Sequence, residues 1–205
     1  MIVLEPTGLV AILRGVTPHE AEAIGAVLVE AGFGAIEVPL NSPDPFASIA
    51  ALTRRYGERT LIGGGTVLAP SDVERVGLAG GRLIVAPNLN GDVIEQSVKH
   101  GLAIVPGVAT PTEAFRALDY GASALKMFPA EASPPEVTKA WLSVLPEETQ
   151  IFPVGGITPE RIAPYRKAGA AGFGIGGALF KPGMTPAQVA EKAKAFVAAW
   201  QGASR

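Results

Sequence analysis

The stretch of sequence that decides the fold is "AGFGAIEVPL" at 31–40, in which a glycine ends a helical run and a short apolar run follows. The same arrangement returns along the chain, and each apolar run ends in Pro or Gly. Its leading glycines are Gly32, Gly57, Gly80, Gly101, Gly121 and Gly169. Subtraction gives intervals of 25, 23, 21, 20 and 48 residues, and the last interval holds a further strand in "TQIFPVGGIT" at 149–158. This spacing is typical of a helix that ends on a left-handed glycine and is followed by a strand.

An opening strand in "LVAILRG" at 9–15 brings the expected number of strands to eight, each followed by a helical run. The strands are continuously apolar and lack strict alternation, as parallel strands covered by helices are. The pattern therefore predicts an α/β fold, a (β/α)8 barrel that forms a single domain over residues 1–205. A doubly wound open sheet is the alternative.

The composition excludes several classes of function. The net charge of -2 does not indicate the positively charged surface that binds nucleic acid. Every apolar run is interrupted before it could span a membrane, and the first residues lack the basic segment of a secretory signal, so a cytoplasmic location is expected. The chain has no cysteine, and His19 and His100 lie far from other candidate ligands. No metal or other cofactor is expected, and the expected partner is a small molecule.

The active site of such a barrel lies at the C-terminal ends of its strands. Reading each predicted strand to its end gives five polar residues that are expected to converge there: Arg14, Glu37, Thr66, Asn88 and Lys126.

Lys126 lies in the middle of the apolar stretch "ASALKMFPA" at 122–130. An apolar setting lowers the pKa of an amine and makes it a nucleophile able to form a Schiff base. The alternative is a buried stem whose ammonium reaches water at the rim. Glu37 lies in an equally apolar strand, so the pair suggests a nucleophile beside a general acid and base, although a structural ion pair would leave the same pattern.

Arg14 ends its strand directly before a glycine, where its guanidinium could clamp a substrate carboxylate or form a salt bridge at the rim. Three glycines, 63–65, precede Thr66. They would let the backbone approach a ligand closely, with the Thr66 hydroxyl adding a hydrogen bond, or they could form a turn.

Two glycine pairs follow the last two strands, in "PVGGITPE" at 153–160 and "GIGGALF" at 174–180. Barrels of this kind often bind phosphate there through backbone N–H groups. Neither pair brings a lysine or arginine, so the amides alone are expected to hold the anion. The alternative is a pair of tight packing turns.

With these motifs in order, the chain resembles the Schiff-base aldolases that cleave 2-keto-3-deoxy-6-phosphosugar acids. The resemblance runs from "AILRGVTP" through "IEVPLNSP", "LIGGGTVL", "IVAPN", "VPGVATPTEAF" and "LKMFPA" to "PVGGITPE". It implies Lys126 as the Schiff-base lysine, Glu37 as proton donor and acceptor, and Arg14 and Thr66 at the pyruvate portion. It further implies that a phosphate end is held by Gly156, Gly176 and Gly177.

Within this family, "EVPLNSP" resembles the branch that acts on the galacto epimer, since the gluco branch usually has arginine near Asn41. The resemblance thus implies reversible cleavage of 2-dehydro-3-deoxy-6-phosphogalactonate into pyruvate and glyceraldehyde 3-phosphate by a homotrimer, without a cofactor, in a route of sugar-acid breakdown. Gly177 stands where relatives often have serine, so weaker phosphate binding is expected.

Other functions stay open at this stage. One is cleavage of the gluco epimer, and another is a phosphosugar isomerase or synthase on the same barrel. A non-catalytic phosphosugar-binding barrel is less expected, because a binding protein has no reason to keep an amine and a carboxylate desolvated together.

Overall fold

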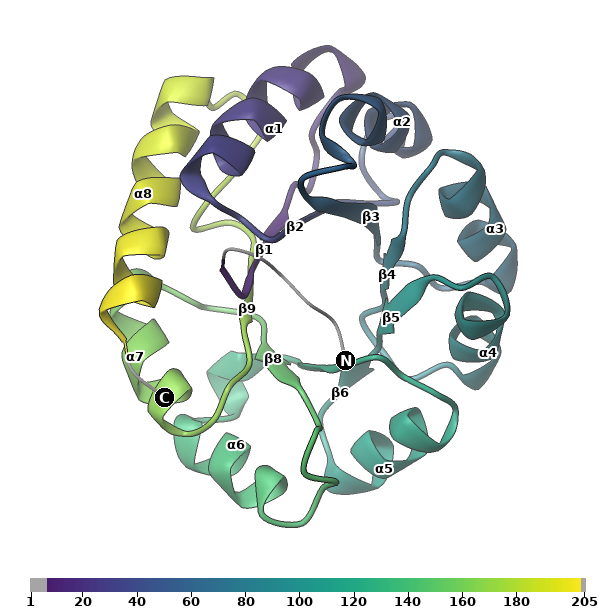
Figure 1. The fold of residues 1–205 in the computed structure, drawn as a ribbon, viewed down its shortest axis with the longest axis vertical. Helices are drawn as coiled ribbons and strands as arrows, with labels where there is room; N and C mark the ends of the chain where they lie inside the picture. The colour runs from purple at the N-terminus through teal and green to yellow at the C-terminus, as the bar shows by residue number, and fades with distance from the viewer. Residues whose placement is uncertain (1–6, 204–205) are drawn as a thin grey trace.

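The computed structural model describes residues 7–203. Residues 1–6, which carry part of the N-terminal stretch used to predict the absence of a secretory signal, lie outside the described residues, as do 204–205. Helices alternate with short strands along the described chain (Figure 1). No helix in residues 7–203 combines the length and the apolar composition that a membrane crossing requires.

The strands are short, parallel and arranged in two sheets, with the orders β5-β4-β3-β2-β1-β9 and β6-β7-β8. Figure 1 shows them curving around the centre of the molecule with the helices outside. Their bounds are β1 (Leu9–Ile12), β2 (Ala35–Pro39), β3 (Leu61–Gly65), β4 (Leu83–Val85), β5 (Ala103–Val105), β6 (Gly107–Val108), β7 (Leu125–Met127), β8 (Ile151–Pro153) and β9 (Phe173–Ile175).

The helices begin at proline in almost every case, where its missing N–H and fixed φ suit the first turn. They are α1 (Pro18–Ala31), α2 (Pro45–Tyr56), α3 (Pro70–Leu78), α4 (Gly91–Lys99), α5 (Pro111–Asp119), α6 (Pro135–Leu142), α7 (Pro159–Lys167) and α8 (Pro186–Gly202), with a single 3-10 turn, η1, at Ala130–Ala132.

Hydrogen bonds and a bridge connect the two sheets at both of their facing edges. On one side Val154 forms a parallel bridge with Gly174, and the Ala171 amide donates to the Ile151 carbonyl at 2.9 Å. On the other side the amide of Ser123, just before β7, donates to the carbonyl of Ile104 in β5 at 2.9 Å. These contacts join β8 to β9 and the start of β7 to β5.

The stretch predicted as one strand in "LAIVPGVA" at 102–109 forms two strands, β5 and β6. Pro106 separates them because proline has no N–H to donate to a ladder. The structure also corrects one of the predicted helix ends. Five of the six leading glycines have left-handed φ values, but Gly57 has a φ of -61°.

Each strand presents alternate residues to two separate apolar clusters, as the period of two requires. In β4, Ile84 belongs to the large cluster packed with the helices, whereas Leu83 and Val85 belong to a small cluster with Phe152. The buried members of the small cluster come from β2, β4, β5 and β8 and from Ala124 just before β7, and they mark the inner face of these strands.

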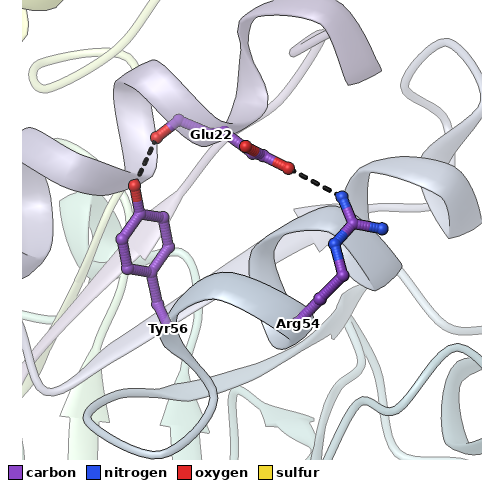
Figure 2. Close-up of polar contacts among 3 residues, drawn as sticks. All are labelled: Glu22, Arg54 and Tyr56. Carbon is purple, nitrogen blue, oxygen red and sulfur yellow. Dashed lines mark hydrogen bonds and ion pairs between the residues drawn. The ribbon is translucent and has the colours of Figure 1, made fainter.

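Polar contacts add to the packing of α1 against α2 (Figure 2). The Glu22 carboxylate accepts a hydrogen bond from Arg54 at 2.8 Å, and the Glu22 carbonyl accepts one from the Tyr56 hydroxyl at 2.9 Å. Arg54 is largely exposed, so its ion pair contributes only about 0–1 kcal/mol. The Tyr56 bond fixes the end of α2 against the first turns of α1.

Candidate active site

Strand alternation turns Glu37 and Lys126 toward the interior. Ile36 and Val38, on either side of Glu37, belong to the cluster under the helices, as do Leu125 and Met127 on either side of Lys126. The charged side chains therefore point the other way, to the inner face. Glu37 is 1% exposed and Lys126 is 6% exposed.

Both charged groups line one internal cavity of about 20 Å³. The rest of its lining is apolar, from residues such as Val85, Val105 and Phe152. Burial raises the pKa of Glu37 to about 7, against the attraction of Lys126 and Arg14. Burial also lowers the pKa of the Lys126 amine, which the Glu37 charge opposes and Arg14 reinforces. Burial thus favours the neutral form of both groups.

Glu37 and Lys126 are close without being a salt bridge. Among the ion pairs of residues 7–203, none joins them, and Glu37 Oε2 is buried with no hydrogen-bond partner. A carboxylate oxygen left without a partner is costly to keep in a purely structural role. The arrangement therefore argues against the structural ion pair and for groups kept apart for chemistry.

The three consecutive glycines form the end of β3 and not a turn. A Cβ on Gly65 would overlap the Glu37 carboxylate, and a Cβ on Gly63 would overlap the backbone of Leu83. Gly65 thus leaves the room that the Glu37 carboxylate occupies. Sequence reasoning assigned this space to a ligand and missed the carboxylate, because the two residues meet only across the β2–β3 pairing.

Arg14 lies two residues beyond the end of β1 and contacts residues that follow β2 and β3. Its Nη1 donates to Asn41 Oδ1 at 2.6 Å, and its Nη2 donates to Thr66 Oγ1 at 3.3 Å. Thr66 has a φ of 54°, in the left-handed region that residues other than glycine rarely adopt. The structure thus brings Arg14 and Thr66 together as predicted and adds Asn41.

An open cleft of about 640 Å³ lies over the inner cavity. Arg14, Lys126 and Phe128 line it, and the Lys126 ammonium lies 4.8 Å from the centre of the Phe128 ring. Lys126 lines both spaces, so its amine is reachable from the cleft while Glu37 lies behind it.

The predicted phosphate-end glycines Gly156, Gly176 and Gly177 all line this cleft. Gly155 and Gly156 have positive φ values of 108° and 59°, so the first pair is a tight turn that favours glycine. The second pair begins a turn in which the Leu179 amide donates to the Gly176 carbonyl at 2.8 Å. Both turns and Lys126 line the same cleft.

Asn88 is the predicted residue that does not join the others. It is exposed and lines neither the inner cavity nor the cleft, whereas its neighbour Pro87 does line the cleft. The prediction that five polar residues converge is therefore wrong for Asn88.

The two glycine stretches themselves contain no lysine or arginine, but a cation lies close to each of them in the structure. Lys181, directly after "GIGGALF", lines the cleft with both pairs. On the other side Arg161 of α7 donates to the Gly156 carbonyl at 2.8 Å and so supports that turn. A search for basic residues just beyond each glycine pair would have found both.

The described residues contain no group of three or more histidine, cysteine or carboxylate side chains placed to hold a metal ion. His19 lies near the start of α1 and His100 follows α4, both exposed, as the sequence suggested. The residues that line the inner cavity and the cleft offer the amine of Lys126, the carboxyl group of Glu37 and the guanidinium of Arg14.

Comparison with known proteins places the chain in a family. The chain is 47% identical over 95% of its length, and 95% of the relative's, to 2-dehydro-3-deoxy-6-phosphogalactonate aldolase of Escherichia coli strain K12. It is 31% identical over 72% of its length, and 70% of the relative's, to 2-dehydro-3-deoxy-phosphogluconate aldolase of Treponema pallidum. The solved structure described as native KDPGal superposes with a TM-score of 0.96 at 46% identity, covering 98% of both chains. The family model for KDPG and KHG aldolase matches residues 3–193, and the chain belongs to this aldolase family.

Proposed function

We propose that the protein is a class I aldolase that cleaves 2-dehydro-3-deoxy-6-phosphogalactonate reversibly to pyruvate and glyceraldehyde 3-phosphate. The observation that carries the proposal is the pair of buried groups, Lys126 and Glu37, which line one cavity without forming an ion pair. The 47% identity to an aldolase with this substrate in its name supports the choice of substrate.

In the cleavage direction the neutral Lys126 amine adds to the C2 carbonyl of the substrate. Protonated Glu37 supplies the proton with which the C2 hydroxyl leaves as water, which gives the protonated imine and the Glu37 carboxylate. The Glu37 carboxylate takes the proton of the C4 hydroxyl as the C3–C4 bond breaks. The bonding electrons move into the imine and leave an enamine, and glyceraldehyde 3-phosphate departs. Protonated Glu37 then gives its proton to C3, and water adds to the imine and releases pyruvate and the neutral amine while the Glu37 carboxylate takes up the proton set free. The protonated imine is the electron sink, so this route requires no metal.

The two ends of the cleft fit the two charged ends of this substrate. Arg14, with Thr66 beside it, is proposed to hold the carboxylate of the pyruvate portion. Backbone amides at Gly156, Gly176 and Gly177 are proposed to hold the phosphate. The lysine that must attack C2 lies in the same cleft.

The proposed architecture is a closed (β/α)8 barrel in one domain, in which β5 and β6 act as one bent strand. The Val154–Gly174 bridge and the hydrogen bond from Ser123 to Ile104 support closure. The helices outside the strands favour a barrel over a doubly wound sheet, which carries helices on both faces. The homotrimer and the cytoplasmic location remain predictions.

The gluco epimer is the second candidate substrate, because the family includes enzymes named for it. Asn41 in the Arg14 contact favours the galacto epimer, since the sequence resemblance associates the other branch with arginine near this position.

The test is incubation with pyruvate and borohydride, followed by peptide mass analysis. One pyruvate adduct on Lys126 is expected, and cleavage assays should give a kcat/KM for the galacto epimer at least equal to that for the gluco epimer. Labelling of another lysine, or of none, would remove the Schiff-base mechanism and leave an isomerase or synthase on the same barrel. A clear preference for the gluco epimer would change the substrate only.

A further inference from the structure

The phosphate end of the cleft contains a lysine whose role no sequence motif assigns. Lys181 lines the cleft together with Gly155, Gly156, Gly176 and Gly177. Its Cε lies 3.9 Å from the position that a Cβ on Gly177 would occupy. The residue is exposed, and no ion pair within residues 7–203 engages it. Its ammonium is therefore available to a ligand beside the second glycine turn.

The other cations of the cleft have different positions. Among the described residues that line it, the cations are Arg14, Lys126 and Lys181. Arg14 is turned toward Asn41 and Thr66, at the ends of β2 and β3, and Lys126 is buried. Lys181 follows β9, which lies on the opposite side of β1 from β2. The guanidinium and the Lys181 ammonium thus serve separate parts of the cleft.

Two charged groups already lie at the first glycine turn, Glu131 and Arg161, and the Arg161 guanidinium is engaged with the Gly156 carbonyl at 2.8 Å. Glu131, from η1, lies against Gly155 and Gly156, because a Cβ on Gly155 would overlap Glu131 Oε2 and one on Gly156 would lie 2.6 Å from Glu131 Cγ. A carboxylate beside the amides opposes the approach of a phosphate dianion. Gly177 supplies no hydroxyl that could compensate.

We infer that Lys181 binds the phosphate group of the substrate and sets the preference for a phosphorylated over an unphosphorylated aldehyde. The inference rests on the proposed aldolase function, and it assigns to Lys181 the cationic contact of the phosphate end. Lys181 is a specificity-determining residue here and takes no part in bond making at C3–C4.

The experiment measures condensation of pyruvate with glyceraldehyde 3-phosphate and with glyceraldehyde, for the wild type and for Lys181→Gln, Lys181→Arg and Lys192→Gln. Lys192 is an exposed lysine of α8 outside the cleft, so its variant makes the same charge change elsewhere. Loss of a charge-assisted contact to phosphate should lower the phosphorylated-to-unphosphorylated kcat/KM ratio about tenfold in Lys181→Gln. Lys181→Arg should keep most of the ratio, and Lys192→Gln should keep all of it.

Inorganic phosphate serves as a second probe. Its inhibition constant should rise about tenfold in Lys181→Gln and stay at the wild-type value in Lys192→Gln. An unchanged ratio and inhibition constant in a Lys181→Gln enzyme that still forms the pyruvate adduct would overturn the inference and leave the aldolase intact. A KM for pyruvate that rises more than the KM for glyceraldehyde 3-phosphate would also overturn it, because Lys181 would then serve the carboxylate end. Failure of the wild type itself to form an adduct would instead refute the proposed function.

Discussion

At the scale of single residues, the proposed mechanism makes Glu37 the group that sets the pH range of activity. Its pKa of about 7, raised by burial, means that acid and base forms are both populated at neutral pH. A group with this pKa can give and take protons in one cycle with little loss in either direction. Below pH 7 the carboxyl group is mostly protonated, and the form that accepts protons is lost.

Exchange of the methyl protons of pyruvate with D2O should therefore fall as the pH decreases through about 7. Glu37→Gln should still form imine but should exchange on the order of 100-fold more slowly, the usual contribution of a positioned acid and base. The slow exchange that remains in Glu37→Gln should no longer depend on a group with a pKa near 7. NMR of the methyl signal measures both effects. Near-normal exchange in the variant would reduce Glu37 to a structural neighbour of Lys126.

Arg14→Ala should raise the KM for pyruvate about tenfold or more, since a guanidinium contact to a carboxylate is lost. Asn41→Ala should raise it less, because it removes only the acceptor that orients Arg14 Nη1. Steady-state kinetics in the condensation direction compares the two, and Asn41→Asp, which keeps an acceptor oxygen, is the matched control. An Arg14→Ala enzyme with an unchanged KM would place the carboxylate elsewhere.

The sequence predicts some of these residues and not others, for a physical reason. Lys126 and Glu37 are recognisable because a charged side chain inside an apolar strand is unusual in itself. Asn41 and Lys181 are ordinary polar residues in loops, and only the pairing of β1 with β2 and β9 makes them part of the site. Their roles depend on contacts between segments far apart in the chain.

At the scale of elements, the position of the Glu37 side chain of β2 depends on the absence of a side chain at Gly65 of β3. Gly65→Ala should displace the Glu37 carboxylate, because the added methyl group would overlap it. Turnover should fall by about 100-fold, the value of the acid and base, while the pyruvate adduct on Lys126 still forms. Adduct yield and turnover, measured on the same sample, separate these effects.

Gly77→Ala is the control for this substitution. A Cβ on Gly77, within α3, would meet only Leu102 Cδ1 at an ordinary 3.7 Å. Alanine is the better helix former, so this variant should be fully active and about 0.5–1 kcal/mol more stable. An equal loss of turnover in the two variants would mean that Gly65→Ala disturbs folding and does not act by displacing the Glu37 carboxylate.

Element order was predictable because each helix and strand leaves its own local pattern, and the glycine spacing marks the junctions. The break between β5 and β6 was less evident, since Pro106 lies inside a run that otherwise reads as one strand. The φ of Gly57 was not predictable either. A glycine can occupy the right-handed region as readily as the left-handed one, and the following loop decides which it takes.

At the scale of the whole molecule, Trp200 links the two ends of the described chain. Its ring packs edge-on to Phe173 of β9 at 6.2 Å, and the guanidinium carbon of Arg166 of α7 lies 3.8 Å from its ring centre. A Cβ on Gly8, just before β1, would overlap Trp200 Cη2, so the indole also covers the first strand. One side chain of α8 thus contacts both the beginning and the end of the strand series.

Trp200→Ala should lower the free energy of unfolding by about 2 kcal/mol, less than the value for a fully buried tryptophan because this ring is only half-buried. The melting temperature should decrease by about 4–8 °C. If the chain is one domain, unfolding should remain a single transition in circular dichroism and fluorescence alike. Lys194→Ala, an exposed change on the same helix, should shift it by less than about 0.5 kcal/mol. Two separate transitions would contradict the single-domain prediction.

The position of Lys126, with the inner cavity on one side and the open cleft on the other, has a consequence for chirality. An enamine attached to its nitrogen would be planar and would present one face to the Glu37 side and the other to the cleft. A proton supplied by Glu37 reaches the first face alone. Pyruvate that acquires three different hydrogen isotopes on its methyl carbon in this site would therefore be formed as a single enantiomer.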